Sequence, residues 1–432
     1  MSQESSPSIR VRRPPGPVSA TLSPPGSKSL TNRALILAAL ASGRSTLRGC
    51  LDSEDTRVML TALERFGLAP VVSDERRLVE LIGKGGPPDT ITEPMRPIEV
   101  ATAGTAARFL TAVLAAAPIV SRVDGSPRMR ERPMEGLLAA LREQGATIVC
   151  SGHDDLLPIE IHGTRLRGGE IRLARPPSSQ FISALILAAA LADAPTRIVL
   201  EQGTPARPYV DMTLVALRDF GGDADWHGPD TILIRPRALH GRDYTIEPDA
   251  SAASYLLALP AIFGGRVTVP ALGRLSVQGD ARFCEVLARM GAAIEQDAHS
   301  TTVTGTGALH GAVLDLSDMP DMTLTAAVLA LHARGRTELH GVEVLRHHES
   351  DRLAAGACEL RKLGALVEEL PGGLIIDPPA QINQHVAIDT YLDHRMAMAF
   401  SLAGEVEIRD PACVAKTFPR YFEVLADLGM IA

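Results

Sequence analysis

The stretch ALREQGATIVC, residues 140–150, contains the local signals that decide the fold of this chain. An amphipathic helical pattern runs up to Gly145, and the segment 146–150, with its β-branched residues, follows at once. Glycine adopts the left-handed backbone conformation that ends many helices, and β-branched residues favour strands. The stretch therefore predicts a helix, a glycine cap and a β-strand.

The same phrase returns along the whole chain. Its glycines are Gly67, Gly145, Gly221, Gly291, Gly364 and Gly429, separated by 78, 76, 70, 73 and 65 residues. A period of this length is too long for a solenoid repeat, but it suits a small α/β unit with helices and a few strands. We therefore expect six copies of one α/β unit, arranged as three copies in each of two domains.

Chain length also predicts two domains, because 432 residues exceed the usual size of one hydrophobic core. The segment 242–265 restarts a strand, an acidic proline turn and an apolar helix, much as residues 19–41 do. We therefore place a boundary near residue 244. The expected domains are residues 26–244 and residues 18–25 plus 245–432, with residues 1–17 forming a flexible tail.

Composition excludes several classes of protein. A hydrophobic content of 45% with 22% charged residues is typical of a globular protein. The net charge of −8 and the 3% aromatic content argue against a nucleic-acid binder. The longest apolar runs, such as residues 184–192, are shorter than the roughly 18 residues that span a membrane. Five scattered cysteines without a CxxC pair predict reduced thiols in the cytoplasm and no metal site.

Polar clusters precede several apolar helices in the first half of the chain. PPGSKSLTNRALILAAL (24–40) places Lys28, Ser29 and Arg33 at a helix N-terminus, where free N–H groups and the helix dipole attract anions. ATAGTAARFL (101–110) and PPSSQFISALILAAALA (176–192) predict similar helix starts, and DGSPRMRERPM (124–134) adds further arginines. Any one of these alone is equally compatible with a capped surface helix.

The second half carries matching clusters in LSDMPDMTLTAAVLA, RHHESDRLAAGACELRKLG, DHRMAMAF and VAKTFPRYF. We expect Asp351 and Asp393 to orient neighbouring arginines rather than to take part in chemistry. Cations and hydroxyls at helix N-termini in both halves of an acidic chain predict a positively charged cleft between two domains. Such a cleft would bind two small anionic molecules, since arginine pairs favour carboxylate and phosphate groups.

Eight of these motifs, in matching order, resemble the family of 5-enolpyruvylshikimate-3-phosphate (EPSP) synthase, 3-phosphoshikimate 1-carboxyvinyltransferase. They are PGSKSLTNRALILAAL, AGTAARFL, DGSPRMRERP, SSQFISALILAA, PDMTLTAAVLA, HESDRLAA, DHRMAMAFSLAG and AKTFPRYFEVLADLG. The resemblance covers almost the whole chain beyond the tail. It implies an α/β fold in two domains, the inside-out α/β barrel of enolpyruvyl transferases, with three βαβαββ-type units in each domain.

The resemblance also implies an activity. The enolpyruvyl group of phosphoenolpyruvate would be transferred by addition and elimination to the 5-hydroxyl of shikimate 3-phosphate, with release of phosphate. This reaction belongs to the shikimate pathway, which leads to chorismate and the aromatic amino acids. The resemblance implies no cofactor and no metal, and we expect a cytoplasmic monomer that binds neither nucleic acid nor membranes.

Site residues follow from the matching motif positions. Asp321 would act as the base and Glu349 as the proton donor, aided by Lys28. The implied phosphoenolpyruvate ligands are Lys28, Gly104, Arg128, Gln180, Arg352, Arg395 and Lys416. The implied ligands of shikimate 3-phosphate are Lys28, Ser29, Arg33, Ser178, Ser179, Gln180, Asp321 and His348.

Four positions depart from the usual pattern of the family: Thr102 in place of Asn, Ala206 in place of Ser, Val344 in place of Asn, and His348 in place of Lys. At least the last three lie on the implied acceptor side, where Thr204 or Arg207 would have to compensate. We hypothesise that His348 is a partly protonated donor, which predicts that the KM for shikimate 3-phosphate rises between about pH 6 and 8.

Three other functions are compatible with parts of this pattern. A sister enzyme acts on UDP-N-acetylglucosamine, but it usually carries Lys-Asn in the first motif and a reactive cysteine in the loop that corresponds to residues 121–133, which here contain none. Changes on the acceptor side also suit an enolpyruvyl transferase with a modified acceptor in a specialised pathway. A non-catalytic module that binds anionic metabolites is the third alternative.

Overall fold

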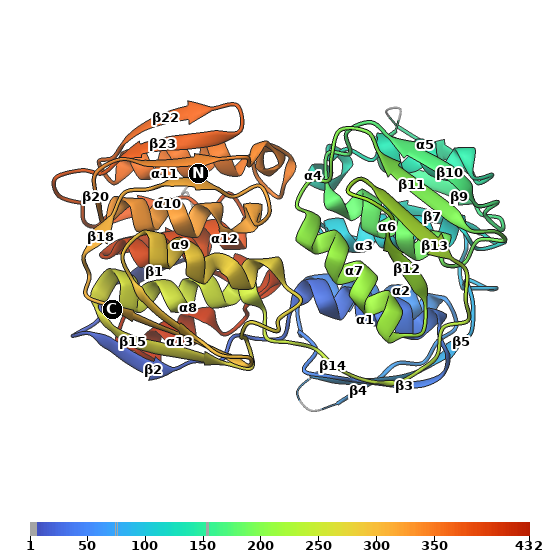
Figure 1. Ribbon diagram of the computed structural model, residues 1–432, viewed down its shortest axis with the longest axis horizontal. Coiled ribbons are helices and arrows are strands. Elements are labelled where there is room, and N and C mark those ends of the chain that lie inside the picture. The colour runs from blue at the N-terminus through green and yellow to red at the C-terminus, as the bar shows by residue number, and fades with distance from the viewer. Residues whose placement is uncertain (1–6, 74, 76, 153–154) are drawn as a thin grey trace, which may run out of the picture. The chain divides into compact units, whose positions relative to one another are not determined.

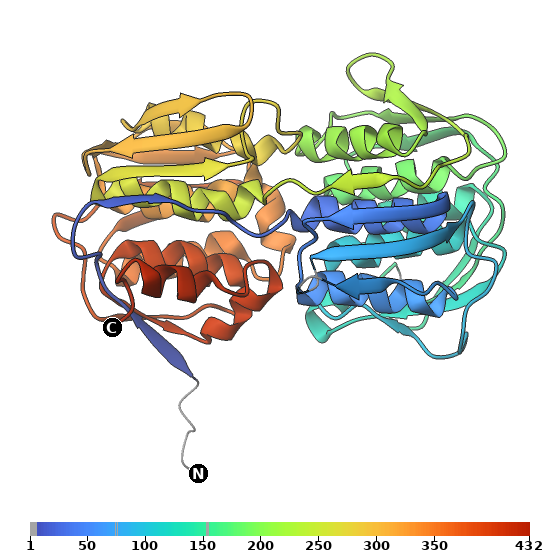
Figure 2. The same ribbon diagram turned by 90° about the horizontal axis from the view of Figure 1, so that it is seen from below.

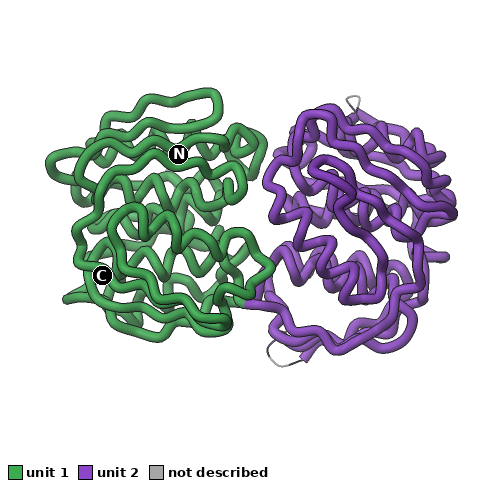
Figure 3. The backbone as a smooth tube through the Cα atoms, viewed as in Figure 1, with its two compact units in different colours: residues 1–25, 248–432 green, residues 26–247 purple. Residues whose placement is uncertain are grey.

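The computed structural model describes residues 7–73, 75, 77–152 and 155–432, which belong to two compact units (Figure 3). Unit 1 comprises the chain up to Pro25 together with Pro248–Ala432, and unit 2 is Gly26–Glu247. The boundary expected near residue 244 would cut through β14 (Asp243–Thr245). This strand pairs in parallel with β3 (Ser42–Arg48), so its hydrogen bonds place it in unit 2.

The strands of unit 2 form three four-stranded sheets of the same design. Each sheet has one parallel pair at an edge, followed by two antiparallel pairs. In order of pairing, the first contains β14, β3, β5 (Leu78–Lys84) and β4 (Val71–Ser73). The second contains β6 (Ile98–Glu99), β7 (Val120–Asp124), β9 (Ile159–His162) and β8 (Thr147–Cys150). The third contains β10 (Gly169–Leu173), β11 (Thr196–Leu200), β13 (Thr231–Arg235) and β12 (Asp223–Trp226).

Unit 1 repeats this design. Its sheets are β2 (Val18–Thr21), β15 (Gly265–Pro270), β17 (Ser300–Gly305) and β16 (Ala293–Gln296); and β19 (Val313–Asp315), β21 (Thr337–His340), β23 (Gly373–Asp377) and β22 (Leu366–Leu370). A three-stranded sheet contains β24 (Val386–Ile388), β25 (Val406–Arg409) and β1 (Ser8–Val11), and a short pair joins β18 (Leu309–His310) to β20 (Ala333–Arg334).

Each unit contains two classes of helix. The helices of a unit lie next to one another, and the strands lie along the outside of the unit (Figures 1 and 2). Helices buried on nearly all sides are α1 (Lys28–Leu40), α3 (Gly104–Ala115), α6 (Ser179–Ala189), α8 (Ala250–Phe263), α10 (Thr323–Leu331) and α12 (His394–Phe400). Half-buried helices are α2 (Glu54–Arg65), α5 (Glu135–Glu143), α7 (Arg207–Asp219), α9 (Phe283–Arg289), α11 (Arg352–Lys362) and α13 (Tyr421–Asp427). A single turn, α4 (Pro127–Arg130), completes the set. No helix within the described ranges is long and apolar enough to cross a bilayer.

The helix–glycine phrase of the sequence is confirmed at every copy. Each glycine lies just after the end of a half-buried helix and has a positive φ: Gly67 at 74°, Gly145 at 113°, Gly221 at 91°, Gly291 at 110°, Gly364 at 97° and Gly429 at 71°. Residues with a Cβ rarely adopt this conformation. The glycines therefore set the point at which the chain leaves each helix, and a strand follows all of them except Gly429.

The N-terminal segment differs from the expected flexible tail. Residues 1–6 lie outside the described residues, but Ser8–Val11 form β1, which pairs antiparallel with β25. In the sheet that contains β24 and β25, β1 takes the position that β17 and β23 occupy in the other sheets of unit 1. Val11 is 3% exposed and belongs to the core of unit 1. The tail prediction is wrong for this strand because sheet pairing and burial outweigh its polar local composition.

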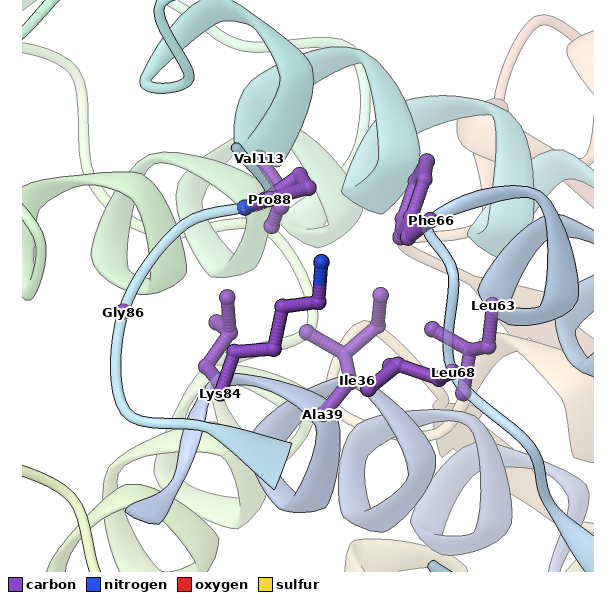
Figure 4. Close-up of a pocket in the computed structure, with 10 residues that line it drawn as sticks. Ile36, Ala39, Leu63, Phe66, Leu68, Lys84, Gly86, Pro88 and Val113 are labelled. Atoms are coloured by element: carbon purple, nitrogen blue, oxygen red, sulfur yellow. The ribbon is translucent and has the colours of Figure 1, made fainter. Parts of the chain in front are cut away.

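A small apolar cavity of about 10 Å³ lies in unit 2 beside α1, α2 and β5 (Figure 4). Its walls include Ile36, Phe66 and Val113, and Lys84 points its Nζ across it. Lys84 Nζ forms an ion pair with Asp89 at 2.6 Å. A space of this size holds about one water molecule, so it is a packing defect rather than a substrate site.

Replacing Val11 by Ala tests the role of β1 in the core. We expect V11A to lower the stability of unit 1 by about 1–2 kcal/mol, since two buried methyl groups are lost. Urea unfolding of the full chain measures the effect. Ser8→Ala on the same strand is the matched control, because Ser8 is exposed. An unchanged midpoint for V11A would show that β1 adds nothing to the core.

Candidate active site

Helix α1 in unit 2 begins with a polar turn. Ser27 is its N-cap and accepts a hydrogen bond from the Leu30 amide. Lys28, the first helical residue, places its Nζ 3.3 Å from Oδ2 of Asp55, which is buried in the first turn of α2. An ammonium at the start of a helix adds to the positive end of the helix dipole. The sequence-predicted Ser-capped start is confirmed, and Asp55 is an additional partner that fixes Lys28.

Arg33 lies one turn further along α1 and is buried inside unit 2. Its guanidinium donates to four neutral oxygens: Thr213 Oγ1 at 2.7 Å, Tyr209 O at 2.9 Å, Ser29 O at 3.0 Å and Ser183 Oγ at 3.2 Å. The Phe109 ring centroid is 5.2 Å from the guanidinium carbon. Burial lowers the pKa of Arg33 to about 10. In this structure Arg33 therefore ties α1 to α6 and α7, and its predicted contact with substrate stays a prediction.

The start of α3 is built around Gly104. Its N-cap residue, Ala103, makes no side-chain capping hydrogen bond. A Cβ on Gly104 would lie 2.7 Å from Arg132 Nη1 and 2.8 Å from Arg108 Nη1. A side chain at this position would therefore require both guanidinium groups to shift. The first turn of α3 is thus surrounded by positive charge, as an anion-binding helix N-terminus requires.

Helix α6 starts beside α3. Ser178 is its N-cap and accepts from the Gln180 amide at 3.2 Å. Gln180 Nε2 donates to Thr105 Oγ1 at 3.4 Å, so the first turns of α6 and α3 meet. Arg128, in α4, is more exposed and pairs with Glu131 at 2.9 Å. Unit 2 therefore brings Gly104, Gln180 and the serine cap of α6 together.

In unit 1, Arg352 is the centre of a dense charge cluster. Asp393 binds it in bidentate geometry, with Oδ2 2.7 Å from Nε and Oδ1 3.2 Å from Nη2. Asp321 Oδ1 lies 2.9 Å from Nη1, and Glu349 Oε2 lies 2.9 Å from Nη2. Burial lowers the pKa of Arg352, but Asp393, Glu349 and Asp321 outweigh burial, so the net shift is upward. This guanidinium therefore stays charged.

Two further cations complete the cluster. Arg395 Nη2 donates to Asp321 Oδ2 at 2.6 Å, and its Nη1 lies 3.3 Å from the Tyr255 hydroxyl. Lys416 Nζ is 3.3 Å from Glu349 Oε1. Unit 1 therefore gathers every site residue that the sequence placed there. Two carboxylates that differ in their cation partners offer separate groups for taking up and releasing a proton.

His348 lies against this cluster. Its Nδ1 is 3.0 Å from Arg352 Nη1, which can only donate a hydrogen bond. In this contact Nδ1 accepts, which fits the neutral ring with its proton on Nε2, and Asp321 Oδ1 lies 3.8 Å from the same nitrogen. This contact argues against the partly protonated His348 that the sequence suggested.

The expected orienting roles of two aspartates are confirmed. Asp393 holds Arg352 and caps α12 by accepting from the Arg395 amide at 2.9 Å. Asp351 caps α11 and pairs with Arg346 at 3.1 Å. Within the described ranges, no group of three or more His, Cys, Asp or Glu side chains is arranged to hold a metal ion.

Arg207, one of the two expected compensating groups on the acceptor side, is engaged elsewhere. Its guanidinium stacks on the Trp226 ring at 3.8 Å from the centroid, and Nη1 donates to Pro229 O at 2.8 Å. Ala206 is the N-cap of α7 with φ 45° and makes no side-chain capping bond. Thr204 Oγ1 is enclosed and has no hydrogen-bond partner among the described residues.

Comparison with known proteins decides the family. The family model for EPSP synthase (3-phosphoshikimate 1-carboxyvinyltransferase) matches residues 12–425. The chain belongs to this family. The 3-phosphoshikimate 1-carboxyvinyltransferase of Erwinia tasmaniensis is 43% identical over 421 residues, covering 96% of this chain and 97% of the relative. That of Sulfurovum sp. is 42% identical over 411 residues, covering 94% and 95%.

Solved structures agree with this assignment. The EPSP synthase of Acinetobacter baumannii superposes with a TM-score of 0.81 at 26% identity and covers 98% of each chain. The enolpyruvyl transferase NikO of Streptomyces tendae gives 0.79 at 19% identity, covering 99% of this chain and 100% of its own, and this likeness concerns the fold alone. The family resemblance drawn from the motifs and the two-domain α/β fold class are confirmed. Both relatives are named 3-phosphoshikimate 1-carboxyvinyltransferase, and the matches cover nearly the whole length of each relative. The alternative functions are therefore not favoured.

Sequence reasoning missed several groups that fix the site. Asp55, Tyr255 and the pair Ser183–Thr213 all contact site cations. Asp55 looks like an ordinary acidic residue in the first turn of a helix, Tyr255 and Ser183 look like core positions of apolar helices, and Thr213 looks like a position on the buried face of an amphipathic helix. No local pattern distinguishes them, because each partner comes from a distant part of the chain.

A strained turn leads into Asp393. Tyr391 and Leu392 have φ values of 55° and 57°, in the left-handed region that residues with a Cβ disfavour. Buried Glu359 holds this turn by accepting from the Tyr391 hydroxyl at 2.8 Å and from the Asp389 amide at 3.2 Å. Strain of this kind persists where surrounding contacts fix it, often at functional sites. Here the turn lies directly before Asp393, the residue that binds Arg352.

Leu392→Asn tests this strain. We expect L392N to stabilise the protein by roughly 1 kcal/mol, because Asn tolerates the left-handed conformation better than Leu. Thermal unfolding measures the change. Leu366→Asn is the matched control, because Leu366 is 75% exposed and Leu392 78% exposed, but Leu366 lies in the strand β22. Equal effects of the two substitutions would contradict the strain argument.

Proposed function

We propose that this chain transfers the enolpyruvyl group of phosphoenolpyruvate to the 5-hydroxyl of shikimate 3-phosphate and releases phosphate. Family membership supports the reaction, and the arrangement of charges supports the assignment of residues. The proposal assigns substrate-binding residues in both units. Cations of unit 1 suit the carboxylate of phosphoenolpyruvate, and cations of unit 2 suit the phosphate groups.

The observation that carries the proposal is the pairing of Arg352 and Arg395. One carboxylate, that of Asp321, accepts from both guanidinium groups at 2.9 and 2.6 Å. The two arginines are therefore spaced to hold a single carboxylate between them. We assign them to the carboxylate of phosphoenolpyruvate, for which two charge-assisted hydrogen bonds supply both affinity and orientation.

Unit 2 supplies groups that suit phosphate. We assign Lys28, Arg128, Gln180 and the backbone of Gly104 to the phosphate of phosphoenolpyruvate, together with Lys416 of unit 1. The crowded guanidinium groups beside Gly104 support this assignment. For shikimate 3-phosphate we assign Lys28, Ser29, Arg33, Ser178, Ser179, Gln180, Asp321 and His348. The buried charge of Arg33, solvated by neutral oxygens, supports an anionic acceptor.

The proposed chemistry needs one proton acceptor and one proton donor. Asp321 removes the proton of the 5-hydroxyl, whose oxygen attacks carbon 2 of phosphoenolpyruvate, while Glu349 delivers a proton to the methylene carbon, aided by Lys28. The tetrahedral adduct then loses a methyl proton back to Glu349. The bond to the phosphate oxygen breaks, and phosphate leaves with the proton that Asp321 held. Both carboxyl groups return to their starting states.

The proposed reaction uses no cofactor and no metal, since acid–base and electrostatic groups of the chain supply each step. We further propose that the protein acts as a cytoplasmic monomer. A single chain carries every assigned residue, and its five free cysteines suit a reducing compartment.

Phosphate release tests the proposal directly. The full chain is incubated with phosphoenolpyruvate while shikimate 3-phosphate is supplied or withheld, and released phosphate is measured. We expect release only when this acceptor is present. Release with UDP-N-acetylglucosamine, or no release with either acceptor, would overturn the proposed function.

Arg395→Gln tests the donor assignment in the same assay. We expect R395Q to lower kcat/KM for phosphoenolpyruvate by about 100-fold, because charge-assisted hydrogen bonds to the donor carboxylate are lost. Arg336→Gln is the matched control in unit 1, since Arg336 pairs with Asp377 on the surface. A similar loss in both variants would show that the effect is general rather than specific to the donor.

The pH dependence of acceptor binding tests the role of His348. We expect the ratio of the KM values for shikimate 3-phosphate in H348Q and wild type to stay constant between about pH 6 and 8, because a neutral ring loses no charge there. Using the ratio cancels the titration of the acceptor phosphate. A ratio that falls toward 1 as the pH rises would instead support a protonated His348.

A further inference from the structure

The carboxylate of Asp321 occupies the place that the proposed function assigns to a substrate carboxylate. Its Oδ1 accepts from Arg352 Nη1 at 2.9 Å and its Oδ2 accepts from Arg395 Nη2 at 2.6 Å. The chain thus supplies an internal carboxylate to its own two-arginine site. The same carboxylate is the group proposed to remove the acceptor proton, and it is engaged by both arginines.

Asp321 and Asp393 hold Arg352 in different ways. The Asp393 side chain is 0% exposed, and it also accepts from Ser350 Oγ at 3.0 Å and from the Arg395 amide at 2.9 Å. Displacing Asp393 would break the N-cap of α12 and leave a buried charge unpaired. The Asp321 side chain is 18% exposed and lies in the short 3₁₀ turn Pro320–Met322. Asp321 is therefore the carboxylate that an incoming anion can replace.

The charge balance of the cluster favours replacement over simple addition. The cations Arg352, Arg395 and Lys416 are matched by the carboxylates of Asp321, Glu349 and Asp393. A further carboxylate placed beside this set would add an unbalanced negative charge at a partly buried site, which is costly. Exchange of one carboxylate for another keeps the balance at the arginine pair.

We propose that the carboxylate of phosphoenolpyruvate displaces Asp321 from Arg352 and Arg395, and that this exchange releases Asp321 to act as the base. The inference rests on the proposed function and adds an order of events to it. Before the donor binds, each carboxylate oxygen of Asp321 accepts a hydrogen bond from one of the two guanidinium groups, so the side chain is held on the arginines rather than on the acceptor hydroxyl. After exchange, that restraint is removed. Donor binding and base activation are then one event, so the base becomes available only when the donor is in place.

Opposite effects of two Asp→Asn changes on the same guanidinium test the exchange. Isothermal titration calorimetry measures binding of phosphoenolpyruvate to the full-length wild type, D321N and D393N. We expect D321N to bind about tenfold more tightly than wild type, because its neutral amide competes less well for the arginines. We expect D393N to bind more weakly, because Arg352 loses the carboxylate that orients it. D321A is a second variant that must change affinity in the same direction as D321N.

The outcomes separate this inference from the proposed function. Weaker or unchanged binding of phosphoenolpyruvate in D321N and D321A, or no detectable binding in these variants, overturns the exchange even if phosphate release by wild type is as expected. Tighter binding supports it, including the case in which only the variants bind measurably. Phosphate release is measured on the same preparations, with thermal unfolding as a check on folding. Full turnover by D321N would instead refute Asp321 as the base, which is a failure of the proposed function.

Discussion

Six helices that are buried on nearly all sides impose the main constraint on this protein. Along most of their length such helices leave no room for a charged side chain without a partner. Their first turns differ, because backbone N–H groups there are unsatisfied and the helix dipole is positive. Polar side chains of the candidate site lie in these first turns, at Lys28, Ser179 and Arg395, and the first turn of α3 contributes the backbone of Gly104. The packing of the helices thus determines both where the site lies and which sign of charge it attracts.

The two units stabilise the charge of a buried arginine in different ways. Arg352 is balanced by carboxylates, so that its charge persists although burial opposes it. Arg33 is solvated by hydroxyl and carbonyl oxygens, and burial lowers its pKa to about 10. A charge that is only solvated raises the positive potential around it, whereas a charge that is already paired has to exchange its partner to bind a ligand. In the proposed site, unit 2 would therefore attract anions through its field, and unit 1 would bind them by an exchange of ion pairs.

Strand pairing explains the course of the N-terminal segment. In each full sheet of the repeats, a parallel edge pair is followed by two antiparallel partners. Strand β25 would present an unpaired edge without β1, and unpaired edges invite pairing with other chains. Ser8–Val11 cover that edge, and Val11 adds an apolar side chain to the core. A segment with a loose, polar appearance is therefore an integral part of unit 1.

The sequence by itself determined the repeating unit, the helix starts and the family, because these depend on neighbouring residues. Ser27, Ser178 and the six capping glycines could be predicted because glycine φ preferences and capping hydrogen bonds act within about one helical turn. Tertiary structure alone decided the partners of Lys28, Arg33 and Arg352, and the pairing of β1. Asp55 reaches Lys28, Thr213 reaches Arg33 and Asp393 reaches Arg352 across separations of 27, 180 and 41 residues. Contacts over such separations depend on how the sheets and helices pack, and no local pattern encodes them.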